Sequence, residues 1–168
     1  MYQDQSAQLR ELVQCAFDKE APVNITGGGT KTFYGRAGEG EPLSAGGHRG
    51  IACYEPSELV LTAAAGTPLA EIEAALDEAG QMLGFEPPYF GRRATLGGAI
   101  ACGLSGPRRP YAGAARDCVL GVRCINGRGQ ALRFGGQVMK NVAGYDVSRL
   151  MTGALGTLGV LLDISLRV

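Results

Sequence analysis

Histidine is nearly absent from this 168-residue chain, and neither sign of charge predominates. The single histidine, His48, leaves little for a histidine-rich metal site or for a serine–histidine–aspartate triad. The 16 basic and 16 acidic residues cancel to a formal charge of zero, whereas a protein that mainly contacts the nucleic-acid backbone normally has a basic excess. These shortages argue against a metal site, triad chemistry and nucleic-acid binding.

The sequence also lacks paired cysteines and long apolar runs. Its five cysteines are irregularly spaced and include no C-x-x-C pair, which favours reduced thiols over a disulfide framework. The N-terminal region is charged and has no signal-peptide core. The longest uncharged runs, 94–107 and 150–162, are too short and too rich in glycine to span a bilayer. We therefore expect a cytoplasmic protein.

Length and hydrophobic patterning predict one α+β domain. Hydrophobic residues make up 45% of the chain and charged residues 19%, which excludes a disordered or coiled-coil protein. Apolar spacing predicts a helix over 9–17 and another that begins with Thr67 as N-cap and Pro68 as its first residue. A further short helix is expected inside 94–103, and Asp146 can cap one that runs through Met151. Strands are expected at 23–26, 51–54, 59–65, 117–125, 130–134 and 160–168, the last half-buried because its apolar residues alternate.

Glycine is abundant and clustered, with 27 residues in the chain. The strand at 23–26 leads directly into three consecutive glycines, which expose backbone N–H groups suited to a phosphate or pyrophosphate; a flexible turn is the alternative. Two further clusters, at 95–98 and 153–159, suit either close approach to a ligand or tight turns. The spacing of the first cluster fits neither the Walker A motif nor G-x-G-x-x-G, which argues against an enzyme of nucleoside triphosphates.

Four segments taken in order resemble the flavin-binding domain of the vanillyl-alcohol oxidase and p-cresol methylhydroxylase (VAO/PCMH) family. They are GGGT at 27–30, ATLGG at 94–98, KNVAGYD at 140–146 and GTLG at 156–159. Within the family, the runs CGLSGPRRP at 102–110 and LRFGGQVMKNVAGYD at 132–146 are most similar to flavin subunits of bacterial glycolate oxidases. The resemblance covers nearly the whole chain.

The resemblance implies a two-lobed α+β fold with FAD between the lobes. Backbone amides in the glycine loop would hold the pyrophosphate, and the segment at 95–98 would complete this cradle. Cys102 and Gly103 would run beside the ribityl chain or the ring, while Gly159 and Val160 would approach the adenine. Because Thr30 stands where covalently flavinylated relatives carry a histidine, noncovalent FAD is expected. The cradle residues are Gly27, Gly28, Gly29, Thr30, Lys31, Thr95, Gly97 and Gly98.

The resemblance also implies a function and partners. Residues 1–168 would form a PCMH-type FAD-binding domain whose substrate-covering cap domain is absent from this sequence. The complete enzyme would oxidise a 2-hydroxy acid, glycolate by the closest resemblance, to a 2-oxo acid and pass electrons to an iron–sulfur subunit. A homologous flavin subunit would be a second partner, and any association with a membrane would run through partners. The alternative is a noncatalytic FAD-binding or assembly module beside a catalytic sister subunit.

Several single residues have competing interpretations. We expect His48, in a polar glycine-rich loop, to be a surface residue and not a catalytic one, and Cys102 to pack rather than to act as a nucleophile. Arg108 and Arg109 can clamp a carboxylate, contact a partner or face solvent, and we favour the last two. Lys140, Tyr145 and Asp146 can face the flavin, although a capping role explains Asp146 equally well. No catalytic base is assigned.

Overall fold

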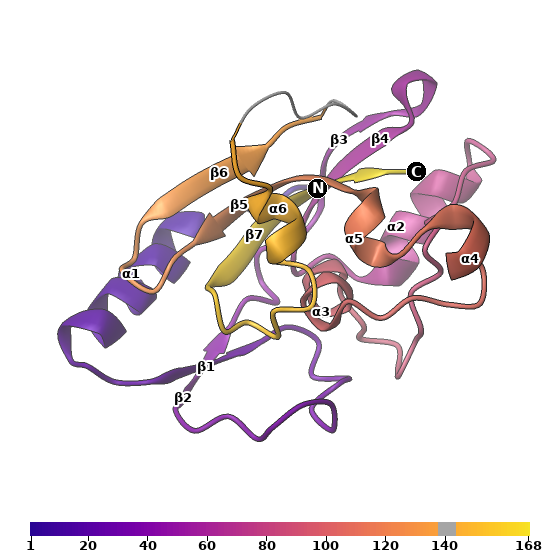
Figure 1. The fold of residues 1–168 in the computed structure, drawn as a ribbon. Helices are drawn as coiled ribbons and strands as arrows, with labels where there is room; N and C mark the ends of the chain where they lie inside the picture. The colour runs from indigo at the N-terminus through magenta and orange to yellow at the C-terminus, as the bar shows by residue number, and fades with distance from the viewer. Residues whose placement is uncertain (138–143) are drawn as a thin grey trace.

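The computed structural model describes residues 1–137 and 144–168, which form two sheets with helices packed around them (Figure 1). The larger sheet has the strand order β3-β4-β7-β5-β6, and the smaller pairs β1 with β2 in parallel. The strands are β1 (Val23–Thr26), β2 (Glu41–Ser44), β3 (Ile51–Glu55), β4 (Val60–Ala64), β5 (Val119–Ile125), β6 (Ala131–Gly135) and β7 (Val160–Arg167). The helices are α1 (Ser6–Asp18), η1 (Pro56–Glu58), α2 (Leu69–Asp77), α3 (Leu96–Cys102), α4 (Arg109–Ala112), α5 (Ala115–Cys118) and α6 (Val147–Leu150).

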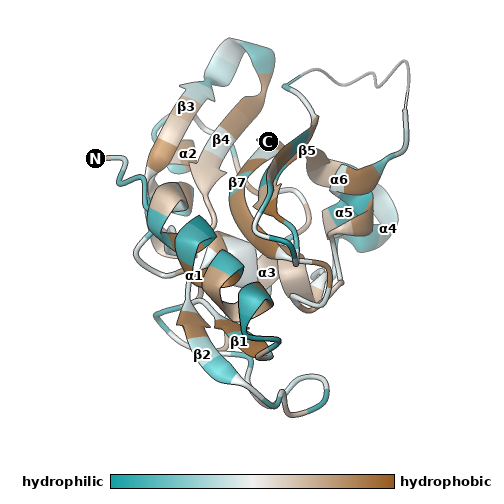
Figure 2. Cartoon of the chain, turned by 90° about the vertical axis from the view of Figure 1, so that its left-hand side faces the viewer, coloured by the Kyte–Doolittle hydropathy of each residue, from teal (hydrophilic) through white to brown (hydrophobic). Residues whose placement is uncertain are grey.

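The larger sheet separates two hydrophobic cores. The main core packs α2 and α3 against the sheet through residues such as Ile72, Leu76 and Ile100, all fully buried. The second core packs Leu9 and Val13 of α1 against the sheet together with Leu43 of β2. Figure 2 shows mostly hydrophobic strands in the larger sheet beside an α1 whose outer surface is largely hydrophilic. The two cores fix the small sheet and α3 relative to β7, which is the framework of the site described below.

Strand β7 lies at the centre of the larger sheet and is buried on both faces. This corrects the expectation of a half-buried strand. The alternating polar residues meet protein groups instead of water: Ser165 shares a hydrogen bond of 2.8 Å with Thr62, and Asp163 joins a polar cluster. The register of β7 against β5 shifts between Arg123 and Cys124, and the apolar residues of β7 divide between the cores, with Leu162 in the second core and Ile164 in the main one.

Most of the expected elements are confirmed, including the first helix, the hairpin of β5 and β6, and the cap on α6, where Asp146 accepts from the Arg149 amide at 3.2 Å. The start of α2 differs from the prediction. Thr67 is fully buried; it donates to the Ala64 carbonyl at 2.6 Å and accepts from the Gly50 amide at 2.8 Å. Because its hydroxyl is used in this way, it does not cap the helix, and Pro68 occupies the N-cap position.

In the described part of the chain, no helix is long and apolar enough to cross a membrane.

Candidate functional site

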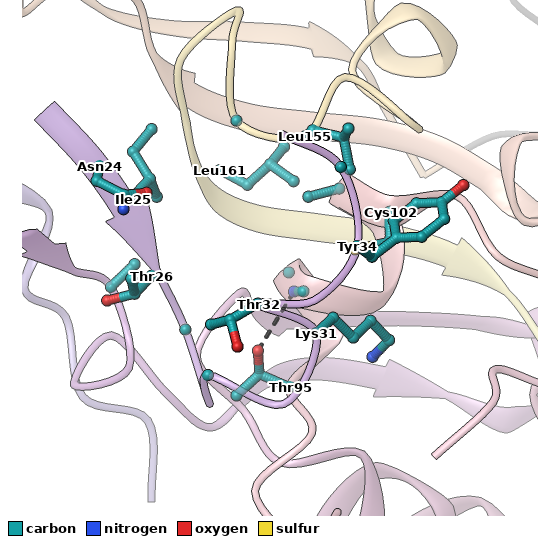
Figure 3. A pocket seen from close by; sticks show the side chains of 18 of the residues that line it. Asn24, Ile25, Thr26, Lys31, Thr32, Tyr34, Thr95, Cys102, Leu155 and Leu161 are labelled. Carbon is teal, nitrogen blue, oxygen red and sulfur yellow. Dashed lines mark hydrogen bonds between the residues drawn. The ribbon is translucent and has the colours of Figure 1, made fainter. Parts of the chain in front are cut away.

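A cavity of about 410 Å³ lies between the small sheet and α3 (Figure 3). Its walls come from the end of β1, the loop at 27–38, the first and last turns of α3, the segment at 151–159 and Leu161 of β7. The volume falls in the range of small-molecule sites. The cavity therefore brings together the three glycine clusters, which are far apart in the sequence.

The first glycine cluster forms a wall made of backbone. A Cβ on Gly27 would lie 2.7 Å from Thr95 Oγ1, and a Cβ on Gly28 would overlap the carbonyl oxygen of Arg93. Gly29 has a φ of +65°, a left-handed conformation that strains other residues. Side chains are thus excluded from this loop, so that a ligand can approach its backbone closely.

The opposite wall is the beginning of α3. Thr95 is buried and accepts from the Gly98 amide at 3.3 Å, which caps the helix. A Cβ on Gly97 would lie 2.7 Å from the Cβ of Ala65, so Gly97 allows α3 to pack against the chain after β4. Within 4 Å of a Cβ on Gly98, the one neighbouring atom would be Thr95 Oγ1, at 3.2 Å. Gly97 is therefore required by packing, whereas Gly98 leaves space in the cavity.

Among the described residues, the charged side chains that line the cavity are both cationic, Lys31 and Arg36. The Lys31 Nζ atom is buried without a hydrogen-bond partner and lies 5.8 Å from the centre of the Phe90 ring. Burial lowers the pKa of Lys31, and burial also raises the pKa of the nearby Cys102 thiol. An ammonium that loses its hydration without gaining a partner is costly. The cavity is therefore suited to an anionic ligand.

The structure brings most of the predicted site residues to this cavity. Those that line it are Gly27, Gly28, Gly29, Thr30, Lys31, Thr95, Gly97, Gly98, Cys102 and Gly159. Gly103 and Val160 lie outside the lining. Gly103 ends α3 with a φ of +64° and packs against Gly153, while Val160 is buried in the second core. Which residues contact FAD stays a prediction.

His48 is fully buried, which corrects the expectation of a surface residue. Its Nδ1 accepts from the Gln5 amide at 3.1 Å, so the proton on the neutral ring is on Nε2, which lies 3.1 Å from Asp163 Oδ1. Tyr2 and Arg123 also donate to Asp163. We call Tyr2, Asp4, His48, Arg123 and Asp163 the His48 cluster. None of them lines the cavity, and their contacts hold the N-terminal segment to the sheet.

The remaining candidates do not line the cavity. Tyr145 is 94% exposed, Asp146 caps α6, and Arg108 and Arg109 are exposed, with the Arg108 amide donating to Glu86 at 3.0 Å. Lys140 is outside the described residues. Sequence reasoning missed Arg36, which lies in a stretch of the chain read only as a polar loop. The signal that could have identified Arg36 as a cavity residue was its place four residues after Thr32, in the same glycine-rich segment.

In the part of the chain that the structure describes, the cavity has a wall of glycine backbone, and its charged side chains are all cationic. These features define a protein that binds an anionic cofactor of nucleotide type. The chain belongs to the FAD binding domain family, which matches residues 2–135. FAD is therefore the cofactor of this domain. The glycine wall fits its diphosphate, and the unpartnered Lys31 ammonium fits a ligand that carries negative charge.

Comparisons with individual proteins agree. The chain is 57% identical over 165 residues to the glycolate oxidase subunit GlcE of Escherichia coli, covering 98% of the chain and 47% of that protein. It is 29% identical to a D-lactate dehydrogenase of Archaeoglobus fulgidus, covering 97% of the chain and 37% of that protein. The structure of an alkyldihydroxyacetonephosphate synthase superposes with a TM-score of 0.76 at 22% identity, over 96% of the chain and 29% of that protein. The expected α+β fold is confirmed. The chain spans about half the length of GlcE and a smaller share of the other two proteins.

Proposed function

We propose that these 168 residues are the FAD-binding domain of a flavin subunit in a glycolate oxidase type of complex. The complete enzyme oxidises a 2-hydroxy acid to a 2-oxo acid. The observation that carries the proposal is the cavity, whose glycine wall suits the FAD diphosphate and whose unpartnered Lys31 ammonium suits an anionic cofactor. The similarity to GlcE and to a D-lactate dehydrogenase supports the reaction type.

Each wall of the cavity has its own part in holding the cofactor. Backbone amides of residues 27–30 bind the pyrophosphate, and the Thr95 hydroxyl with Gly97 and Gly98 closes the other side of the cradle. Gly159 lies at the adenine end, and Cys102 lies at the ring end. Gly103 and Val160 act indirectly, by ending α3 and by anchoring the start of β7. When bound, FAD accepts a hydride from the substrate, so the protein's task is to position and tune it.

FAD is held here without a covalent bond. Thr30 lines the cavity where flavinylated relatives carry a histidine, and a threonine hydroxyl does not provide the ring nitrogen of a histidyl link. Adding FAD to the purified chain should produce bound flavin, measured by its visible absorbance after removal of free cofactor. Acid precipitation should then release all flavin into the supernatant. Colour in the protein pellet would contradict noncovalent binding. A chain that shows no flavin absorbance after free cofactor is removed would contradict the FAD site itself.

Two kinds of partner follow from the proposed complex: a homologous flavin subunit and an iron–sulfur subunit that receives the electrons. An assembly is supported by the GlcE relative, which is one subunit of a glycolate oxidase. Co-purification of the chain with each candidate subunit, expressed together, tests this. An exclusively monomeric chain in the presence of both would count against it.

A second candidate function is a noncatalytic FAD module beside a catalytic sister subunit. It is favoured by one observation: within the described ranges, no aspartate, glutamate or histidine lines the cavity, so neither a carboxylate nor an imidazole base is at hand for the substrate hydroxyl. The isolated chain should not oxidise glycolate even when it carries FAD, because it lacks the groups that hold the substrate against the flavin. Such positioning of the substrate can be worth roughly 7–11 kcal/mol. Turnover with an artificial acceptor within about tenfold of the assembled enzyme would contradict this.

The two candidates are separated in the assembled complex. A variant that cannot bind FAD in this subunit should abolish turnover if the subunit is catalytic. It should leave turnover intact if a sister subunit does the chemistry.

A further inference from the structure

Lys31 follows the glycine loop directly, and its place in the sequence therefore assigns it to the pyrophosphate. Its ammonium, however, lies on the side of the cavity that holds Cys102 (Figure 3). The Nζ atom is 5.8 Å from the Phe90 ring and close enough to the Cys102 thiol for the two groups to influence each other's pKa. In Figure 3 Lys31 is on the side of Cys102 and Tyr34, whereas Asn24 and Ile25 are on the far side.

The cavity has a distinguishable middle and two ends. The middle is the cradle, where Gly27 approaches Thr95 Oγ1. One end is formed by β1 and the last glycine cluster, since a Cβ on Gly156 would lie 3.5 Å from Ile25. The other end is formed by the last turn of α3, with Cys102, and by Lys31. An extended dinucleotide whose pyrophosphate occupies the cradle places its adenosine at one end and its flavin ring at the other.

The environment of Lys31 suits a ligand that is neutral in one state and negatively charged in another. The ammonium is buried beside apolar and aromatic groups, and no acidic side chain of the described residues lines the cavity. In such surroundings an interaction with a developing negative charge is stronger than in water. Oxidised flavin is neutral in its ring. Reduction adds two electrons and one proton, which leaves a negative charge on the ring.

We propose that Lys31 stabilises the negative charge of the reduced flavin ring and thereby raises the reduction potential of the bound FAD. The inference rests on the proposed function, because it places the ring at the Cys102 end. Lys31 then tunes the cofactor, and the backbone amides of the glycine loop carry the diphosphate. Charge near the ring nitrogens is one of the means by which proteins set flavin potentials.

The test compares Lys31→Met with Lys19→Met, which removes the same charge from an exposed position after α1. The full chain is loaded with FAD and titrated with dithionite as electron donor to obtain the midpoint potential. Dissociation constants are measured for oxidised FAD and for ADP, which has the diphosphate but no ring. Urea unfolding confirms that each variant is folded.

We expect Lys31→Met to weaken binding of reduced FAD about tenfold relative to oxidised FAD, which lowers the potential by about 30 mV for a two-electron couple. Its affinity for ADP should stay within about twofold of wild type. Lys31→Arg should restore the potential, and Lys19→Met should change nothing. Loss of ADP affinity with an unchanged potential would overturn the inference and return Lys31 to the pyrophosphate, and no change in either quantity would also overturn it. A wild-type chain that binds neither FAD nor ADP would instead overturn the proposed function.

Discussion

The cavity and the His48 cluster are two polar regions that meet the same strand. Leu161 of β7 lines the cavity, and Asp163, two residues later, is the centre of the cluster. In the cluster the buried groups satisfy one another: Asp163 accepts from Tyr2 at 2.8 Å and from Arg123, and lies 3.1 Å from His48. In the cavity the Lys31 ammonium has no partner. A saturated network holds the fold together, whereas an unsatisfied buried charge indicates where a ligand binds.

The pKa directions express the same contrast. Burial pushes the pKa of Asp163 upward, but hydrogen bonds from His48 and Tyr2 and the charge of Arg123 outweigh it and lower the pKa below its usual value. Lys31 has no comparable compensation, and burial lowers its pKa. Removing a charge should therefore have opposite effects on stability in the two regions.

The largest effect is expected in the cluster. Asp163→Asn leaves Arg123 and His48 without their carboxylate, and losing charge-assisted hydrogen bonds in a partly buried network of this kind costs about 1.5–3 kcal/mol. Urea unfolding of the chain without cofactor measures the loss. Asp77→Asn, at the exposed end of α2, is the matched control and should change stability by about 0.5 kcal/mol or less. Equal losses in the two variants would contradict the stabilising role of Asp163 in the cluster.

The pH dependence sharpens this prediction. A carboxyl whose pKa is lower in the folded than in the unfolded chain stabilises the fold above the unfolded value, about 3.9, and this stabilisation is lost as the pH falls through the folded pKa. Wild type should therefore lose stability on acidification below about pH 4 more steeply than Asp163→Asn. Free energies of unfolding measured across this range test it, and parallel curves would contradict the role of Asp163.

The smallest effect is expected in the cavity and has the opposite sign. Lys31→Met removes an unpartnered buried ammonium and should stabilise the cofactor-free chain by about 1 kcal/mol. Lys19→Met serves as the control, with no expected change. Urea unfolding in the absence of FAD measures both variants. Destabilisation by Lys31→Met would mean that the ammonium already has a stabilising role in the fold.

Local patterns predicted much of the fold and of the site. The glycine loop after β1, the Asp146 cap and the β5–β6 hairpin depend on neighbouring residues, and all were predicted from the sequence. Long-range contacts were not. His48 is buried because the N-terminal segment and β7 come together around it, 43 and 115 residues away. The central position of β7 likewise follows from pairing with two distant strands, which alternation alone does not reveal.

The central claim is that the cavity binds FAD and that the His48 cluster serves the fold. The most direct measurement is the dissociation constant of FAD for Gly98→Leu and for His48→Gln, beside Gly127→Leu in the exposed hairpin turn as control. Gly98 suits this purpose because a Cβ there meets only Thr95 Oγ1, at 3.2 Å, whereas Gly28 packs directly on the Arg93 carbonyl; around Gly127 there is open space. Gly98→Leu should weaken FAD binding at least about a hundredfold, roughly 2.7 kcal/mol, while His48→Gln lowers stability and leaves the affinity of the folded chain near wild type. Unchanged affinity in Gly98→Leu would contradict the account.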